Sequence, residues 1–105
     1  MCINKILSQK GQTTISNCIG CKTFYIWHDN LMLSFTEEGF ISFKEVLHSL
    51  SFEDRCLPFP GGEERIILHT PHDDISFAFA EEEFELCKAA IDEAIFMKEV
   101  YELMQ

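Results

Sequence analysis

Apolar and polar residues alternate in two stretches of the chain, and a short polar turn interrupts each of them. The first stretch covers residues 24–35 around Asp29-Asn30, and the second covers residues 68–79 around Asp73-Asp74. Asp and Asn tolerate the positive φ angles of tight hairpin turns. Because side chains alternate between the two faces of a strand, the pattern predicts two β-hairpins, each with one apolar face.

Two-residue turns at these positions fix which residues of each hairpin lie opposite one another. In the first hairpin the opposed pairs are His28 with Leu31, Ile26 with Leu33 and Phe24 with Phe35. In the second hairpin they are His72 with Ile75, Thr70 with Phe77 and Leu68 with Phe79. Pro71 lacks the N–H group that a strand ladder needs, so a sheet edge or a bulge is expected there.

Apolar residues spaced by three and four positions follow each hairpin and predict a helix in both places. The first helix is expected from Thr36 to Leu50, with Thr36 as N-cap and acidic residues in the first turn, which the helix dipole favours. The second is expected from about Ala80 to Met104. It carries more apolar surface than one sheet contact requires, which makes Phe96 and Val100 candidate interface residues.

The beginning of the chain predicts a third hairpin. Its strands are expected at Ile3–Ser8 and Gln12–Cys18, around the three-residue loop Gln9-Lys10-Gly11. Residues 51–64 contain the prolines and glycines of a loop or crossover. The expected fold is a two-layer α+β domain in which an antiparallel sheet of about six strands packs on two helices, in the order β-β-β-β-α-β-β-α.

The two hairpin–helix units, at about residues 22–50 and 65–104, resemble each other. Residues 28–40 and 72–84 are identical at six of thirteen positions, which is more than chance gives and indicates an internal ββα repeat. Similar local structure offers a second explanation, because any hairpin before a helix favours Asp or Asn in its turn and acidic residues at the helix start. Both explanations stay open at this point.

The length and composition of the chain indicate its number of domains, its compartment and the partners that it is unlikely to bind. With 105 residues and 47% apolar content, the chain is expected to form one domain, residues 1–105, without needing a disulfide or a metal. Its net charge of −10 disfavours binding to nucleic acids and to anionic membranes. The chain shows no apolar run of membrane-spanning length and no secretion signal, and its cysteine count is odd, so we expect a cytoplasmic protein with free or metal-bound thiols.

The cysteines are candidate metal ligands. Cys18 and Cys21 form a CxxC turn, which can supply two thiolates to zinc, and the three-residue loop predicted above places Cys2 opposite Cys18. A closed zinc site needs a fourth ligand, for which His28 and Cys56 are candidates. The alternative is that these cysteines pack as small apolar residues, in which case the protein carries no cofactor. A redox dithiol is less favoured, because the CxxC lies between strands rather than at a helix start.

A candidate protein interface lies on the face of the first hairpin that points away from its apolar side. This face carries Tyr25, Trp27 and Met32, which are residue types enriched in protein interfaces. Either another part of the chain covers it, with the first hairpin of the chain as the candidate, or a partner does.

Four features together resemble a small bacterial family of unknown function: an initial Met-Cys, the CxxC at residues 18–21, the pattern Asn30-Leu31-x-Leu33-x-Phe35, and the acidic helix start that follows. The resemblance covers the first half of the chain and part of the second hairpin–helix unit. It implies no known activity and no catalytic residue. Its cysteines match Cys2, Cys18 and Cys21, which adds weight to the zinc hypothesis.

Three functions follow from these patterns. The favoured one is a non-enzymatic interaction or regulatory module that forms a homo-oligomer through the Trp27 face or the terminal helix. The second is a zinc-binding module that uses Cys2, Cys18 and Cys21. The third is a small enzyme with its site near residues 51–64, although the sequence names no catalytic residue.

Overall fold

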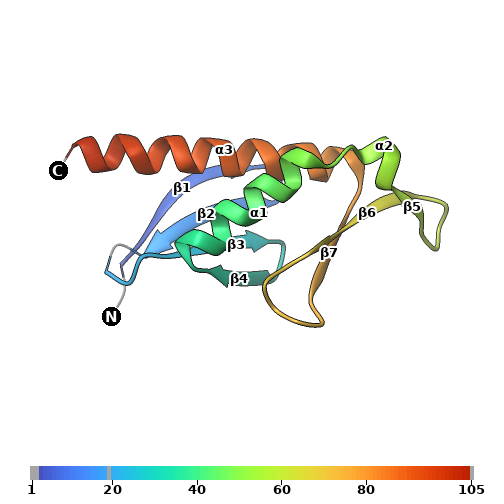
Figure 1. Cartoon of the computed structure of the whole chain (residues 1–105), viewed down its shortest axis with the longest axis horizontal. Helices are drawn as coiled ribbons and strands as arrows, with labels where there is room; N and C mark the ends of the chain where they lie inside the picture. Colours follow the sequence, from blue (N-terminus) through green and yellow to red (C-terminus); the bar gives the residue numbers. More distant parts are fainter. Residues whose placement is uncertain (1–2, 19, 105) are drawn as a thin grey trace.

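The residues that the structure describes form seven strands and three helices, which follow the expected α+β order (Figure 1). The computed structural model describes residues 3–18 and 20–104. The elements are β1 (Asn4–Lys10), β2 (Thr13–Cys18), β3 (Thr23–His28), β4 (Leu31–Phe35), α1 (Glu37–Ser49), α2 (Phe52–Arg55), β5 (Leu57–Pro58), β6 (Glu64–His69), β7 (Ser76–Phe79) and α3 (Glu81–Leu103).

The β3–β4 hairpin has the register that its turn predicts. Phe24 lies opposite Phe35, Ile26 opposite Leu33, and His28 opposite Leu31. Asp29 in the turn has a φ of 54°, the left-handed conformation that Asp adopts more readily than most residues. This hairpin forms one half of a four-stranded antiparallel sheet with the order β1-β2-β3-β4.

The β1–β2 hairpin differs from the expectation in its turn and register. Lys10 pairs with Thr13, so the turn contains two residues, Gly11 and Gln12, instead of three, and Gly11 takes the positive φ of 57°. An irregularity between Ile6 and Ser8 then shifts the register by one residue, as a β-bulge does. Cys18 consequently lies opposite Asn4, which differs from the predicted register, and Cys2, its predicted cross-strand partner, lies outside the described residues.

The second hairpin, β6–β7, is also out of the expected register. His69 pairs with Ser76 and Leu68 with Phe77, so a six-residue loop replaces the predicted turn at Asp73-Asp74. Thr70 explains the longer loop, because its hydroxyl donates to the carbonyl of Ile75 at 2.8 Å and accepts from the backbone N–H of His72 at 3.1 Å. The side chain thus replaces ladder bonds beside Pro71, which has no N–H to donate.

The strands form two sheets rather than the single six-stranded sheet expected. The second sheet has three strands in the order β5-β6-β7. Its strand β5 lies within residues 51–64, which the sequence predicted to be a loop. The two hairpin–helix units therefore differ: one has a two-residue turn within a four-stranded sheet, and the other has a long loop within a small sheet. An internal repeat is not confirmed.

Both long helices begin and end where the sequence predicts. Thr36 caps α1, its hydroxyl accepting the backbone N–H of Gly39 at 3.0 Å, and Leu50 ends this helix. At the start of α3, the Glu83 carboxylate accepts the backbone N–H of Ala80 at 2.9 Å. The helices cover one face of the four-stranded sheet, with α3 packed on β1 and β2 and α1 packed on β3 and β4 (Figure 1).

A cluster of phenylalanine rings fills the space between the sheets and the helices. The rings of Phe24 and Phe40 stack with centroids 4.4 Å apart, and Phe35 meets Phe40 edge-on at 6.1 Å. Phe77 and Phe79 of the second sheet stack on each other at 4.8 Å. All five side chains are buried within one core cluster that includes residues of both sheets and both long helices.

The two sheets meet at the start of α3. The His28 ring of β3 lies 4.8 Å from the Phe79 ring of β7, and its Nε2 lies 3.5 Å from a carboxylate oxygen of Glu83. The other oxygen of Glu83 accepts a hydrogen bond from Arg65 of β6 at 3.2 Å. Glu83 therefore links a strand of each sheet to the first turn of α3.

Replacing Phe40 by Ala tests the importance of the ring cluster. The change removes a fully buried ring that contacts β3 and β4, so the free energy of unfolding should fall by about 3–5 kcal/mol. Urea denaturation followed by circular dichroism measures this loss. Ile41→Ala is the matched control in the same helix: Ile41 is 39% exposed, and its replacement should cost less than about 1 kcal/mol. Equal losses in the two variants would contradict the assigned core.

Candidate functional site

The face of the four-stranded sheet that points away from the helices forms a continuous surface. Two rows of cross-strand neighbours make up its centre. The first row is Ile6, Ser16, Tyr25 and Ser34, and the second is Gln9, Thr14, Trp27 and Met32. We call these eight residues the open sheet face. The β1–β2 hairpin extends this surface instead of covering it, because it lies in the same sheet as β3 and β4.

Large apolar side chains on the open sheet face are accessible to solvent. Trp27 is 39% exposed, Met32 is 47% exposed and Ile6 is 63% exposed. The indole N–H of Trp27 donates to the Ser16 hydroxyl at 2.9 Å, which fixes the orientation of the ring. A shallow hollow beside Trp27 is lined by Ile6, Thr14 and Ser16 among others, and Asp29 of the β3–β4 turn also lines it. The structure thus brings Tyr25, Trp27 and Met32 together as the sequence predicted. It adds Ile6 of β1, a strand of the hairpin that the sequence offered as a cover for this face.

The open sheet face carries no charge. Its eight residues are one each of Ile, Tyr, Gln, Thr, Trp and Met and two Ser, although the protein carries 26 charged residues and a net charge of −10. Charged residues of the same strands point the other way, toward α3: Lys10 pairs with Glu93, and Lys5 lies over the Tyr101 ring. The sheet therefore separates an uncharged surface from the charged rest of the molecule.

The terminal helix places its candidate interface residues elsewhere. Phe96 is 62% exposed and Val100 is half-buried, and both lie on α3, which packs on the opposite face of the sheet from Trp27. The exposed acids Asp92 and Glu99 lie within one helical turn of Phe96. The interface residues predicted from the sequence thus form two separate surfaces, one uncharged and one acidic.

The CxxC turn lies at the end of β2. The backbone N–H of Cys21 points to the Cys18 sulfur at 3.4 Å, and the N–H of Lys22 donates to the Cys18 carbonyl at 3.0 Å. Cys18 is disulfide-bonded, whereas the sequence predicted free or metal-bound thiols. Cys2 lies outside the described residues. Among residues 3–18 and 20–104, no group of three His, Cys, Asp or Glu side chains is placed to hold a metal ion.

The two candidates for a fourth zinc ligand lie far from this turn. Cys18 lies opposite Thr23, the first residue of β3, whereas His28 is the last residue of that strand. Five residues of extended strand place His28 about 16 Å from the position opposite Cys18. Cys56 follows α2, at the opposite end of the long axis from the β2–β3 turn (Figure 1). Its thiol donates to the Glu64 carboxylate at 2.7 Å. Neither side chain completes a site at the CxxC turn.

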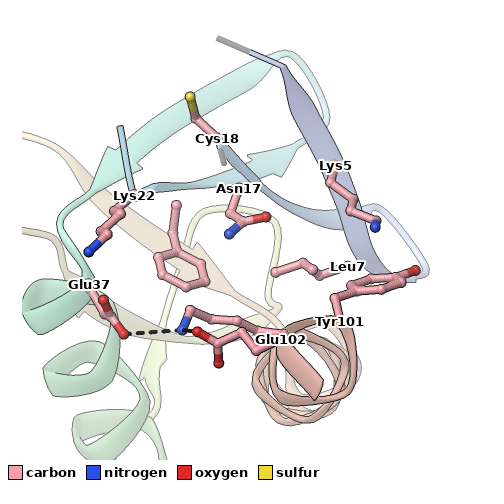
Figure 2. A pocket seen from close by; sticks show the side chains of 10 residues that line it. Lys5, Leu7, Asn17, Cys18, Lys22, Glu37, Tyr101 and Glu102 are labelled. Atoms are coloured by element: carbon pink, nitrogen blue, oxygen red, sulfur yellow. Dashed lines mark hydrogen bonds and ion pairs between the residues drawn. The ribbon is translucent and has the colours of Figure 1, made fainter. Parts of the chain in front are cut away.

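A pocket of about 250 Å³ lies beside the CxxC turn, between the sheet and the end of α3. Figure 2 shows Lys22 and Glu37 on one side of it, Lys5 and Tyr101 on the other, and Asn17 and Leu7 between them. The sequence analysis missed this pocket, because its residues come from distant parts of the chain and form no local pattern.

Comparison with known families finds a match over residues 1–103 to a family described as a family of unknown function, DUF6686. The chain belongs to the DUF6686 family. This confirms the resemblance inferred from the Met-Cys start, the CxxC and the hairpin pattern. No curated protein and no solved structure matches the chain. Membership of DUF6686 brings no activity with it, so the residues themselves must support any functional argument.

One further observation concerns membranes. In the described part of this DUF6686 protein, none of the helices combines the length and the apolar character that crossing a lipid bilayer requires.

The environment of Cys56 gives a testable pH dependence. The hydrogen bond to Glu64 raises the pKa of the Cys56 thiol, and desolvation and the Glu64 charge act in the same direction. Glu64→Gln should therefore lower this pKa, so that the thiolate forms at lower pH and alkylation by iodoacetamide becomes faster at fixed pH. Mass spectrometry of the Cys56 peptide over a pH series measures the rate.

Two comparisons make the Cys56 experiment specific. Glu53→Gln, which changes an exposed acid of α2, should not change how the alkylation rate of Cys56 depends on pH. Cys87 is fully buried and its pKa is raised to about 12, so it should resist alkylation until the protein unfolds. An unchanged Cys56 profile in Glu64→Gln would show that the hydrogen bond does not control this thiol.

Proposed function

We propose that the protein is a non-enzymatic interaction module that self-associates through the open sheet face. The observation that carries this proposal is the exposure of Trp27, Met32 and Ile6 among eight outward-facing sheet residues that include no charged side chain, in a protein whose net charge is −10. Accessible aromatic and apolar side chains of this kind are typical of interfaces.

Charge favours the open sheet face as the surface through which two copies of this chain meet. Two molecules with a net charge of −10 repel each other, and this repulsion is smallest when their uncharged surfaces face each other. The open sheet face is such a surface, and sheets commonly pack face to face at about 10 Å. A symmetric pair would bury both Trp27 side chains and leave the acidic residues in solvent.

The size of the open sheet face indicates the strength of the association. Four strands at a spacing of about 4.8 Å, each contributing about six residues, give a flat area on the order of 400 Å². A standard interface buries about 800 Å² on each partner, so this area is about half the standard size and falls in the range of weak, transient contacts. We therefore expect a reversible, concentration-dependent association in the micromolar range rather than an obligate dimer.

The exposed side of α3 is less suited to pairing two identical chains. Phe96 lies between Asp92 and Glu99, so helix-to-helix contact of two copies would bring carboxylates of like charge together. The open sheet face carries no such penalty. This difference favours the sheet among the two interfaces considered from the sequence.

Zinc binding remains an alternative function, and a single contact at the CxxC turn supports it. The N–H of Cys21 directed at the Cys18 sulfur is an arrangement that stabilises a thiolate, but Cys18 must be reduced before it can bind a metal. Zinc analysis of reduced protein purified without chelator decides the question, and less than about a tenth of an equivalent would exclude this function.

The small enzyme remains a prediction without a supporting observation. Neither the hollow beside Trp27 nor the pocket beside the CxxC turn includes a residue of the segment 51–64.

Self-association is tested by sedimentation velocity across a range of concentrations. The unchanged protein should show a monomer–dimer equilibrium in the micromolar range. Met32→Glu should shift it strongly toward monomer, because each copy then brings a carboxylate to the contact, and a tenfold or larger weakening is expected. A protein that stays monomeric at about 100 µM would contradict the proposal.

Phe96→Glu is the matched control for the sedimentation experiment. It also replaces an exposed apolar residue by an acid and changes the net charge equally, but it does so on α3. The dimer should survive this change. If Phe96→Glu dissociates the dimer and Met32→Glu does not, the interface lies on α3 and the open sheet face is not the contact.

A further inference from the structure

The hollow beside Trp27 combines one aromatic ring with several uncharged polar side chains. It has a volume of about 540 Å³, which lies within the size range of small-molecule sites. The carboxamides of Asn4, Gln9 and Gln12 and the hydroxyl of Thr14 line it. Of the described residues that line this hollow, Asp29 alone carries a charged group. Such a lining is built for hydrogen bonds rather than for ion pairs.

Trp27 offers a ligand the apolar surface of its ring. Its indole N–H already donates to the Ser16 hydroxyl at 2.9 Å, so the polar atom of the ring is satisfied within the protein. Ser16 belongs to the neighbouring strand β2, and the hydrogen bond therefore holds the ring toward that strand. Because Trp27 is still 39% exposed, part of the ring is available for stacking in a fixed orientation.

The three carboxamides are available to a ligand. Asn4, Gln9 and Gln12 are exposed, and no hydrogen bond of their side chains occurs in the part of the chain that the structure describes. A carboxamide carries both N–H donors and an acceptor oxygen. A ligand hydroxyl group also donates and accepts, so hydroxyl groups and carboxamides satisfy each other.

The row Gln9, Thr14 and Trp27 shows where one ring of a ligand fits. These residues are cross-strand neighbours on β1, β2 and β3. With strands about 4.8 Å apart, Gln9 and Trp27 start about 10 Å from each other, and Thr14 lies between them. A ring can therefore lie over Thr14 with the indole on one side and a carboxamide on the other.

Charge and length narrow the class of ligand further. None of the described residues that line the hollow is a Lys or an Arg, and the protein has a net charge of −10, so anionic ligands are disfavoured. Asn4 and Gln9 are roughly 15 Å apart along β1, which is longer than one sugar ring. The lining thus suits a neutral, hydroxyl-rich ligand of more than one ring.

We propose that this hollow binds a neutral oligosaccharide, with one sugar ring packed against Trp27 and its hydroxyl groups hydrogen-bonded to Gln9 and Gln12. Asn4 binds the next ring along β1. The face of an aromatic ring is negative and attracts the partly positive C–H groups of a sugar ring. The site does not rest on the self-association proposed above, although a second copy and a saccharide would compete for Trp27.

Trp27 reports binding directly, because it is the single tryptophan of the chain. Cellotriose, a neutral oligosaccharide, should change the fluorescence of about 0.1 µM protein saturably, with a dissociation constant of about 1 mM. Sorbitol has the hydroxyl groups but no ring, and should bind at least tenfold more weakly. The proposal is overturned if cellotriose gives no saturable change up to about 50 mM, or if sorbitol binds equally well.

A second protein concentration separates this proposal from self-association. At about 100 µM protein, followed by NMR, a dimer through the open sheet face should lower the apparent affinity for cellotriose, because it covers Trp27. Equal affinity at both concentrations would count against the dimer and would leave the saccharide site supported.

Variants assign the site to the hollow. Gln9→Ala and Gln12→Ala should each weaken cellotriose binding by about three- to tenfold, since each removes one hydrogen-bonding group. Asn17→Ala is the matched control, because Asn17 carries the same group on β2 but lines the pocket beside the CxxC turn. Circular dichroism verifies that each variant is folded. A loss of affinity in Asn17→Ala equal to that in the other two variants would overturn the proposed site.

Discussion

The stack formed by Phe24 of β3 and Phe40 of α1 holds a helix against the centre of the four-stranded sheet. Phe35 and Phe43 continue this contact along β4 and α1, and Phe77 connects it to the second sheet. Aromatic pairs contribute about 0.5–1.5 kcal/mol beyond the area that they bury. Because these rings come from three strands and α1, they hold α1 on the face of the four-stranded sheet that α3 also covers.

This one-sided packing explains the surfaces on which the functional proposals are based. With α1 and α3 on one face, the other face has no element to cover it, and its side chains remain in solvent. The acidic residues are carried largely by the helices and loops, while the outward positions of β1–β4 hold uncharged residues. The same layering creates the lysine-lined pocket, since the end of α3 lies over β1 and β2 and leaves a gap beside the CxxC turn.

Glu83 gives the junction between the two sheets an electrostatic component. Its carboxylate accepts hydrogen bonds from Ala80 and Arg65 and faces the ring nitrogen of His28. The acidic start of α3, which the sequence explains through the helix dipole alone, thus also connects strands of different sheets. A residue that appears generic in its local pattern has a specific role once the tertiary structure brings Arg65 and His28 to it.

The sequence by itself determined those features that depend on local physics. The hairpin at Asp29-Asn30, the cap at Thr36 and the limits of both long helices follow from turn chemistry, capping and apolar spacing, all of which act over a few residues. The placement of Tyr25, Trp27 and Met32 on the face away from the helices follows in the same way, because strand alternation around a correctly placed turn fixes the face of each side chain.

Only the tertiary structure decided the features that depend on contacts between distant segments. The bulge in β1 and the Thr70 side chain set registers that a simple turn rule does not predict, so Cys18 faces Asn4 and the second hairpin ends in a long loop. The division into two sheets and the placement of Lys5, Lys22 and Lys98 around one pocket depend on how packed elements approach one another. Such approaches are governed by the fit of the whole core, which leaves no periodic signal in the sequence.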